Sequence, residues 1–117
     1  MIDRKQARQH YKQTPRPAGV ILIKNLVNGK MFIDSSPNLN VAFNKHKAQL
    51  KFGSHRNQRL QQDWNQFGPD NFSFEILEQL KLQEDVNYNY TDDLKILRQI
   101  WLDKLQPFDD RGYNKKT

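Results

Sequence analysis

Two of the three histidines in this chain, His46 and His55, lie close together in the sequence. An imidazole accepts or donates a proton near neutral pH, so the pair is a candidate for general acid and base chemistry. The chain has no cysteine that would support a metal site at this pair. The alternative is structural: His46 packs beneath a hairpin, and His55 caps or solvates a loop. We favour this second interpretation.

Two carboxylates, Asp34 and Glu75, are candidates for a different chemistry. Mg²⁺ prefers hard oxygen ligands, so the two side chains would form a metal site if they faced the same cleft. The alternative is that Asp34 occupies a turn at the end of a strand while Glu75 lies on the solvated face of another strand. We favour the alternative, and we expect no metal or other cofactor.

The cations of the chain are unevenly distributed. The net charge is +6, and residues 1–60 contain twelve Lys or Arg against two acids, whereas residues 61–117 contain seven against eleven. A basic half predicts a polyanionic partner such as DNA or RNA, although basic segments also serve solubility or contact with acidic proteins. The candidate nucleic-acid-binding residues are Arg4, Lys5, Arg8, Lys12, Lys45, Lys47, Lys51, Arg56 and Arg59. For the last five, an ordinary solvated helix face is an equally good explanation.

The size of the chain allows one domain. Its 117 residues include thirteen aromatic side chains, enough bulk for a small core. The first residues lack the apolar segment of a signal peptide, and no run approaches the length of a membrane span. The lack of cysteine also excludes disulfides. We therefore expect a folded cytoplasmic protein with no membrane partner.

The element that must position the candidate site is a β-hairpin over residues 19–36. Apolar and polar residues alternate on both sides of Asn28-Gly29, which predicts two antiparallel strands joined by a two-residue type I′ turn. Ser35-Ser36-Pro37 then predicts a helix that begins with a serine cap and a proline and ends at Gly53. A second helix is expected over residues 57–67, paired with the first as a hairpin.

The second half of the chain predicts one more strand and one more helix. The strand starts at Asn71 and buries Phe72, Phe74 and Ile76 on one face. Residues 81–90 form a loop, after which Thr91 caps a helix that Pro107 terminates. Trp64 and Trp101 fall on the apolar stripes of their helices, so both are expected in the core rather than stacked on bases, and Tyr113 is expected to tuck onto it. The predicted fold is α+β: a three-stranded, largely antiparallel sheet flanked by helices, in the order ββααβα.

At this level of detail the chain resembles a GIY-YIG nuclease domain, over nearly all of residues 18–114. The resemblance rests on short segments whose order and spacing match the family. They include Gly19-Val20-Ile21, Asn28-Gly29-Lys30, Phe32-Ile33-Asp34-Ser35-Ser36, Phe43-Asn44-Lys45-His46, Phe52-Gly53-Ser54-His55, Phe72-Ser73-Phe74-Glu75-Ile76 and Gly112-Tyr113-Asn114. The resemblance implies hydrolysis of a phosphodiester strand with two tyrosines, an arginine and a glutamate that holds a divalent metal.

The family's functional positions are substituted in this chain. Carried over by the resemblance, the first tyrosine falls on Ile21, the second on Phe32, the motif glycine on Asp34, the arginine on Ala42 and the glutamate on Arg98. None of these side chains can perform the family's role, because a base needs a polar atom, a developing phosphoryl charge needs a cation, and a metal needs an anionic ligand. Possible substitutes nearby are His46, His55 and Asn114, with Lys45 one helical turn beyond Ala42.

The sequence therefore predicts a basic N-terminal arm or helix at 1–17, a GIY-YIG nuclease-like domain at 18–114 and a tail at 115–117. We expect a domain that has lost the standard catalysis and binds DNA or RNA through its basic half. One alternative is an active endonuclease that uses Mg²⁺ or Mn²⁺ with Asp34, Glu75, His46 or His55. Another is a module that binds a protein, which would require an exposed apolar patch and no affinity for polyanions.

Overall fold

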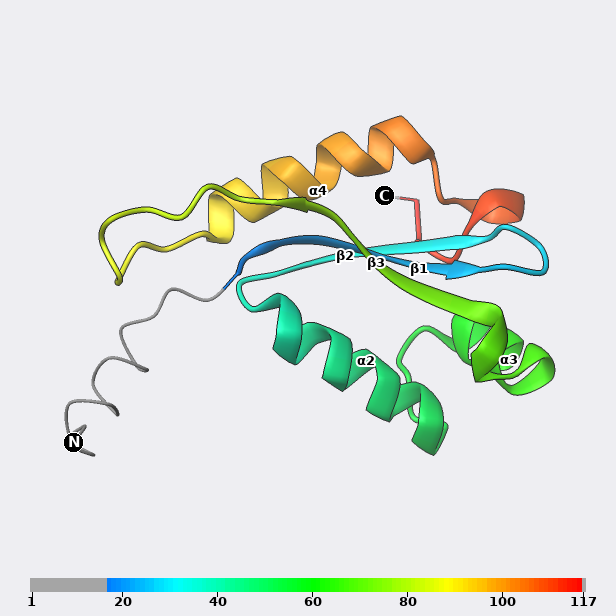
Figure 1. The fold of residues 1–117 in the computed structure, drawn as a ribbon. Coiled ribbons are helices and arrows are strands. Elements are labelled where there is room, and N and C mark those ends of the chain that lie inside the picture. Colours follow the sequence, from blue (N-terminus) through cyan, green and yellow to red (C-terminus); the bar gives the residue numbers. More distant parts are fainter. Residues whose placement is uncertain (1–16, 117) are drawn as a thin grey trace, which may run out of the picture.

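The computed structural model describes residues 17–116, so the predicted N-terminal arm, including Arg4, Lys5, Arg8 and Lys12, lies outside the described residues except for Pro17. Six main elements follow one another along the chain (Figure 1). They are β1 (Gly19–Asn25), β2 (Met31–Ser36), α2 (Leu39–Phe52), α3 (Gln58–Phe67), β3 (Phe72–Gln79) and α4 (Thr91–Leu105). The predicted α+β class and element order are confirmed. None of the helices in this range is both long enough and apolar enough to cross a membrane.

The sheet has the strand order β2-β1-β3, and both pairings are antiparallel. Helix α4 covers one face, and α2 and α3 lie on the other (Figure 1). Alternate residues of β1 point to opposite faces, so Val20 and Leu22 pack with Leu97 of α4 while Ile21 and Ile23 belong to the clusters on the α2 and α3 side. The central strand is therefore buried on both faces, which explains its run of apolar residues.

The turn of the hairpin differs from the prediction. Residues 26–29 form a four-residue turn in which the Asn25 N–H bonds the Lys30 carbonyl and the Gly29 N–H bonds the Asn25 carbonyl. Gly29 has a φ of 77°, but Asn28 does not have a positive φ, so the turn is not type I′. Asn28 instead uses its side-chain oxygen to accept a bond from the Lys30 N–H. The asparagine serves this turn as a hydrogen-bonding group.

Two helix caps were also predicted wrongly. The N-cap of α2 is Asn38, whose side chain accepts from the Val41 N–H, because Ser36 is already bonded to the backbone of Asn38. The N-cap of α4 is Tyr90, while Thr91 is the first helical residue and its hydroxyl donates to the Asn89 side chain. The predicted end of α2 is correct: Gly53 has a φ of 75° and its N–H bonds the carbonyls of the last turn.

Strand β3 buries less of its phenylalanine face than predicted. Trp64 of α3 packs against Phe72 and Phe74, with ring centroids 5.2 and 6.2 Å away. Ile76, further along this edge strand, is 44% exposed, which contradicts its predicted burial. The pairing of β1 with β3 shifts register between Val20 and Ile21, just where the covered part of β3 ends. An alternating pattern identifies a strand, but the packing of other elements on it decides how much of it is buried.

The C-terminal segment closes the core, as expected for Tyr113, which is 1% exposed. Its N–H bonds the Met31 carbonyl, and Gly112 forms a bridge with Met31. A Cβ at Gly112 would clash with the Pro107 carbonyl, so this close approach requires glycine. The segment after α4 is therefore held against the start of β2, and this contact fixes the position of the residues that follow Tyr113.

Replacing Tyr113 by phenylalanine is expected to lower the free energy of unfolding by about 1 to 2 kcal/mol. The hydroxyl donates to Asp63 at 2.6 Å and accepts from the buried Asn25 side chain at 3.1 Å, and both groups would lose a partner. Urea denaturation would measure the change. Tyr88→Phe is the matched control, because that hydroxyl bonds Asp93 at the surface. Equal losses in the two variants would contradict a structural role for the buried network.

Candidate functional site

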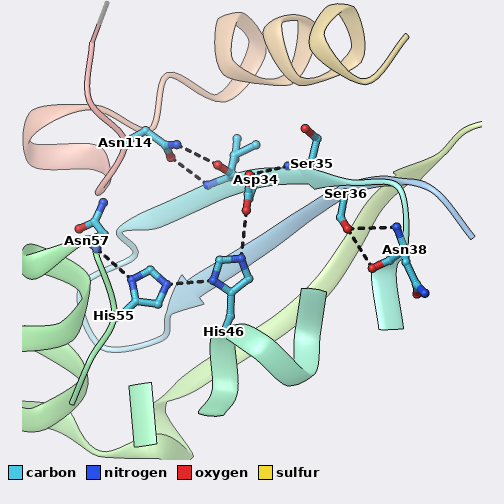
Figure 2. Close-up of polar contacts among 9 residues, drawn as sticks. Asp34, Ser35, Ser36, Asn38, His46, His55, Asn57 and Asn114 are labelled. Carbon is cyan, nitrogen blue, oxygen red and sulfur yellow. Dashed lines mark hydrogen bonds and ion pairs between the residues drawn. The ribbon is translucent and has the colours of Figure 1, made fainter. Parts of the chain in front are cut away.

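A carboxylate and two imidazoles form one hydrogen-bonded chain at the junction of β2, α2 and the start of α3. The Asp34 carboxylate lies 3.0 Å from His46 Nε2, and His46 Nδ1 lies 2.9 Å from His55 Nε2. The Asn57 backbone N–H donates to His55 Nδ1 at 3.1 Å. Figure 2 shows Asp34 pointing from β2 toward His46, with His55 beside it. We call these four residues, Asp34, His46, His55 and Asn57, the histidine chain.

The donors and acceptors in the histidine chain have only one consistent assignment. A backbone N–H can only donate, so His55 Nδ1 accepts and the His55 proton is on Nε2. That proton is donated to His46 Nδ1, which places the His46 proton on Nε2, where it faces the Asp34 carboxylate. Both imidazoles are therefore neutral, and all four of their ring nitrogens are used inside the chain.

Burial, hydrogen bonds and neighbouring charges keep His55 and Asp34 in that state. His46 is 1% exposed and His55 is 5% exposed. Burial, together with the neighbouring His46 and the Arg56 charge, lowers the pKa of His55 from 6.5 to about 4. Burial acts to raise the pKa of Asp34, but hydrogen bonds from His46 and the Ser35 N–H outweigh it, and the pKa lies below its usual 3.8. At neutral pH Asp34 is ionised and His55 is uncharged.

The packing around the imidazoles is apolar. The Phe32 ring contacts both histidines edge-on, with centroid distances of 5.7 Å to His46 and 5.6 Å to His55. To act as a base on a ligand, either imidazole would have to give up a bond within the histidine chain. The geometry favours the structural alternative, with His46 beneath the hairpin and His55 accepting from the loop before α3.

The other positions carried over from the family lie in or near the core. Ile21 is fully buried, Phe32 is 7% exposed and Ala42 is 6% exposed. Ile21 and Ala42 pack in the same small cluster beneath the sheet. Arg98 is on α4, across the sheet from Ala42 (Figure 1). Apolar packing therefore fills the places that the family resemblance assigns to a base, its partner and a cation.

The metal site considered for Asp34 and Glu75, which the sequence analysis did not favour, does not form in the structure. Asp34 pairs with Ile21 and Glu75 pairs with Leu22, and these neighbours on β1 point to opposite faces. The two carboxylates are thus on opposite sides of the sheet and cannot share one ion. Among residues 17–116 no three His, Asp or Glu side chains gather as a metal site, and the glutamate position is Arg98. The residues present do not fit the divalent metal that the resemblance implies.

Asn114, a possible substitute in the sequence analysis, is committed to the backbone. Its amide oxygen accepts from the Ile33 N–H and its amide nitrogen donates to the Ile33 carbonyl, both at 2.8 Å (Figure 2). These two hydrogen bonds anchor the C-terminal segment to β2 beside Asp34. Asn114 is a positioning residue for the strand, and its polar atoms are not directed toward the histidines.

The basic residues predicted between positions 45 and 59 do not form one continuous surface in the structure. Lys47 and Lys51 are one helical turn apart on α2, and the Lys47 ammonium lies 4.9 Å from the centre of the Phe74 ring on β3. Lys45 is two residues before Lys47 and so points to another side of the helix. Arg56 and Arg59 instead lie near Lys115 and Lys116. Lys115 and Lys116 were assigned to the tail and not to the basic surface. The only sequence signal for their position was the predicted burial of Tyr113, two residues before Lys115.

The comparisons with known proteins fit this geometry. No protein-family model matches the chain, and no curated protein matches it. Among solved structures, it is similar to the catalytic domain of homing endonuclease I-TevI, with a TM-score of 0.70 and 26% sequence identity over 86% of this chain and 99% of that chain. A mutant catalytic domain of intron endonuclease I-TevI gives a TM-score of 0.68 and 26% identity over 84% and 92%. This chain therefore forms a GIY-YIG-like domain, with the fold of the I-TevI catalytic domain.

Proposed function

We propose that this GIY-YIG-like domain binds DNA or RNA and does not cleave it by the mechanism of its fold family. The observation that carries the proposal is the closed histidine chain, in which every ring nitrogen of His46 and His55 already has a partner. A proton acceptor must reach the proton it removes, and these nitrogens are buried and occupied. The remaining family positions supply no replacement.

Electrostatics supports the same conclusion. Asp34 is an ionised carboxylate where the family has glycine, and it disfavours the approach of a phosphodiester. Ala42 has no charge with which to stabilise a developing phosphorane, and Arg98 repels the cation that a glutamate would attract. Because the base, the cation and the metal ligand of the usual mechanism are all replaced, no step of that mechanism retains the group that performs it.

The binding half of the proposal is supported by exposed cations on the α2 and α3 side. Within residues 17–116 the only contact of ion-pair type joins the neutral His46 to Asp34, so the exposed lysines and arginines of these helices have no carboxylate partner there. Unpaired cations on one side of a small domain release counterions when they contact phosphates, which favours binding. The similar solved structure is the catalytic domain of an endonuclease, a class of protein that handles nucleic acid.

Binding to single-stranded DNA and RNA is expected to weaken steeply as the salt concentration rises. Each phosphate contact contributes about −0.7 to the slope of log K against log salt, so three contacts give about −2. Fluorescence anisotropy of a labelled oligonucleotide between low and physiological salt would measure this slope. A flat salt response, or no binding at low salt, would exclude nucleic-acid binding through the basic surface.

A further inference from the structure

Four cations surround a cavity of about 660 Å³ next to the start of α3. Arg56 and Arg59 come from the loop and first turn of α3, and Lys115 and Lys116 come from the end of the chain. One acidic residue, Asp109, also lines the cavity. We call this feature the C-terminal cavity. It borders the histidine chain through Asn57, which belongs to both, but none of its cations is a member of that chain or occupies a catalytic position of the fold family.

Side-chain-to-backbone hydrogen bonds hold the two segments that carry these cations, the start of α3 and the end of the chain, next to each other. The Asn57 side chain donates to the Tyr113 carbonyl at 2.7 Å, which joins the start of α3 to the C-terminal segment. Asn114 is bonded twice to Ile33, so Lys115 leaves the domain at a defined point. The Arg59 guanidinium donates to the Asp109 carbonyl at 2.7 Å and lies 6.0 Å from the centre of the Tyr113 ring. The cavity is thus built on fixed elements.

The charge of the cavity is uncompensated within the described chain. Four cations and a single acidic residue, Asp109, line the cavity, and among residues 17–116 no lysine or arginine lies within ion-pair distance of a carboxylate. The volume falls within the range of about 300 to 1,000 Å³ of small-molecule sites, which leaves room for more than one phosphate group. Guanidinium groups bind phosphate oxygens in a bidentate manner, and ammonium groups add mobile point charges.

We propose that the C-terminal cavity binds a run of two or more phosphate groups, which a nucleic-acid strand supplies. The nucleic-acid source rests on the proposed function, whereas the affinity for phosphates rests on the cavity alone. A strand held here passes beside the histidine chain without entering the apolar cluster at Ile21 and Ala42. The cavity therefore gives the domain a strand-binding site that is separate from the cleft of its fold.

The test compares two double variants with equal loss of charge. Lys115→Gln with Lys116→Gln removes two exposed cavity lysines that hold no part of the fold together. Lys81→Gln with Lys95→Gln removes two exposed lysines that do not line the cavity. The cavity variant is expected to bind a single-stranded oligonucleotide about tenfold more weakly at low salt, with a salt slope reduced by about 1.4. The control is expected to stay within about twofold of the wild type.

A second titration uses inorganic tripolyphosphate and the amide NMR signals of the wild type. Shifts concentrated at Gln58, Lys115 and Lys116 would support phosphate binding in the cavity. If the same protein bound neither DNA nor RNA, the nucleic-acid source and the proposed function would both be wrong, but phosphate binding in the cavity would stand. If oligonucleotides bind but the two double variants lose affinity equally, the cavity proposal is overturned and nucleic-acid binding stands. Tripolyphosphate shifts spread over other basic residues, or none at all, would also overturn it.

Discussion

Substitution of His46 by alanine is expected to lower the free energy of unfolding by about 3 to 4 kcal/mol. The change removes a side chain that is 1% exposed, leaves the Asp34 carboxylate without its 3.0 Å donor, and deprives His55 Nε2 of its acceptor. Removing the hydrogen-bond donor of a partly buried carboxylate typically costs more than losing a bond between neutral groups, and the vacated volume adds to the loss. Chemical denaturation followed by circular dichroism would measure it.

The neighbouring substitution Lys45→Ala provides the control. Lys45 is on the same helix and exposed, so its removal is expected to change stability by no more than about 0.5 kcal/mol. If His46→Ala were as mild as the control, the histidine chain would not be a structural element. That result would return His46 to the list of candidates for chemistry.

Acidification is expected to destabilise the domain by about 3 kcal/mol between pH 6.5 and pH 4 through His55. The unfolded chain protonates this imidazole near pH 6.5, whereas in the folded domain its pKa is about 4. Between these values the unfolded state binds more protons, so the free energy of unfolding falls by up to about 1.4 kcal/mol per pH unit as the pH decreases. Asp34, whose pKa is lowered below 3.8, loses its contribution only at more acidic pH.

The control for the pH effect is His55→Gln, which does not titrate but retains an amide that can donate to His46 Nδ1. Urea denaturation at several pH values between 4 and 7 should give a flatter dependence for this variant than for the wild type. NMR titration of the His55 ring would report its pKa directly. Parallel curves for the two proteins would show that the pH dependence arises elsewhere.

Much of the fold could be predicted because its strongest signals are local. The alternation around Gly29 identifies the hairpin, and the stripe of Leu94, Leu97, Trp101 and Leu105 identifies α4. In the structure Leu94 and Leu97 of this stripe are buried, together with Leu102. The errors occurred where two local options compete. Ser36 and Asn38 are both capping residues, and a hydrogen bond between them decided which one caps α2. Asn28 can adopt a positive φ or bond through its side chain, and it does the latter.

The site was predictable only in part because its contacts join distant segments. His46 and His55 were considered as one pair and Asp34 and Glu75 as another, whereas the structure links Asp34 to His46. The face of β2 carried the missing signal, since Asp34 and Phe32 are two residues apart and share the side that faces α2. No pattern in the sequence places Lys115 and Arg56 around one cavity, because their proximity depends on the path of the backbone after α4.

In this scaffold the residues at the family's catalytic positions on the α2 side of the sheet stabilise the fold, and exposed residues of α2 and α3 carry charge. Ile21 and Ala42 add to the core, and the histidine chain ties β2 to both helices on its side of the sheet. A polar catalytic centre must instead keep groups available to solvent and substrate, often at a cost in stability. In this chain the corresponding positions Ile21, Phe32 and Ala42 are instead part of the core.

Incubation of the purified protein with supercoiled plasmid, single-stranded DNA and RNA in Mg²⁺ or Mn²⁺ tests the central claim most directly. We predict that the nucleic acids remain intact at protein concentrations that shift them on a gel. Reproducible cleavage by the wild type that is lost in a folded His55→Gln variant would contradict the account, because it would show that the histidine chain opens and performs chemistry.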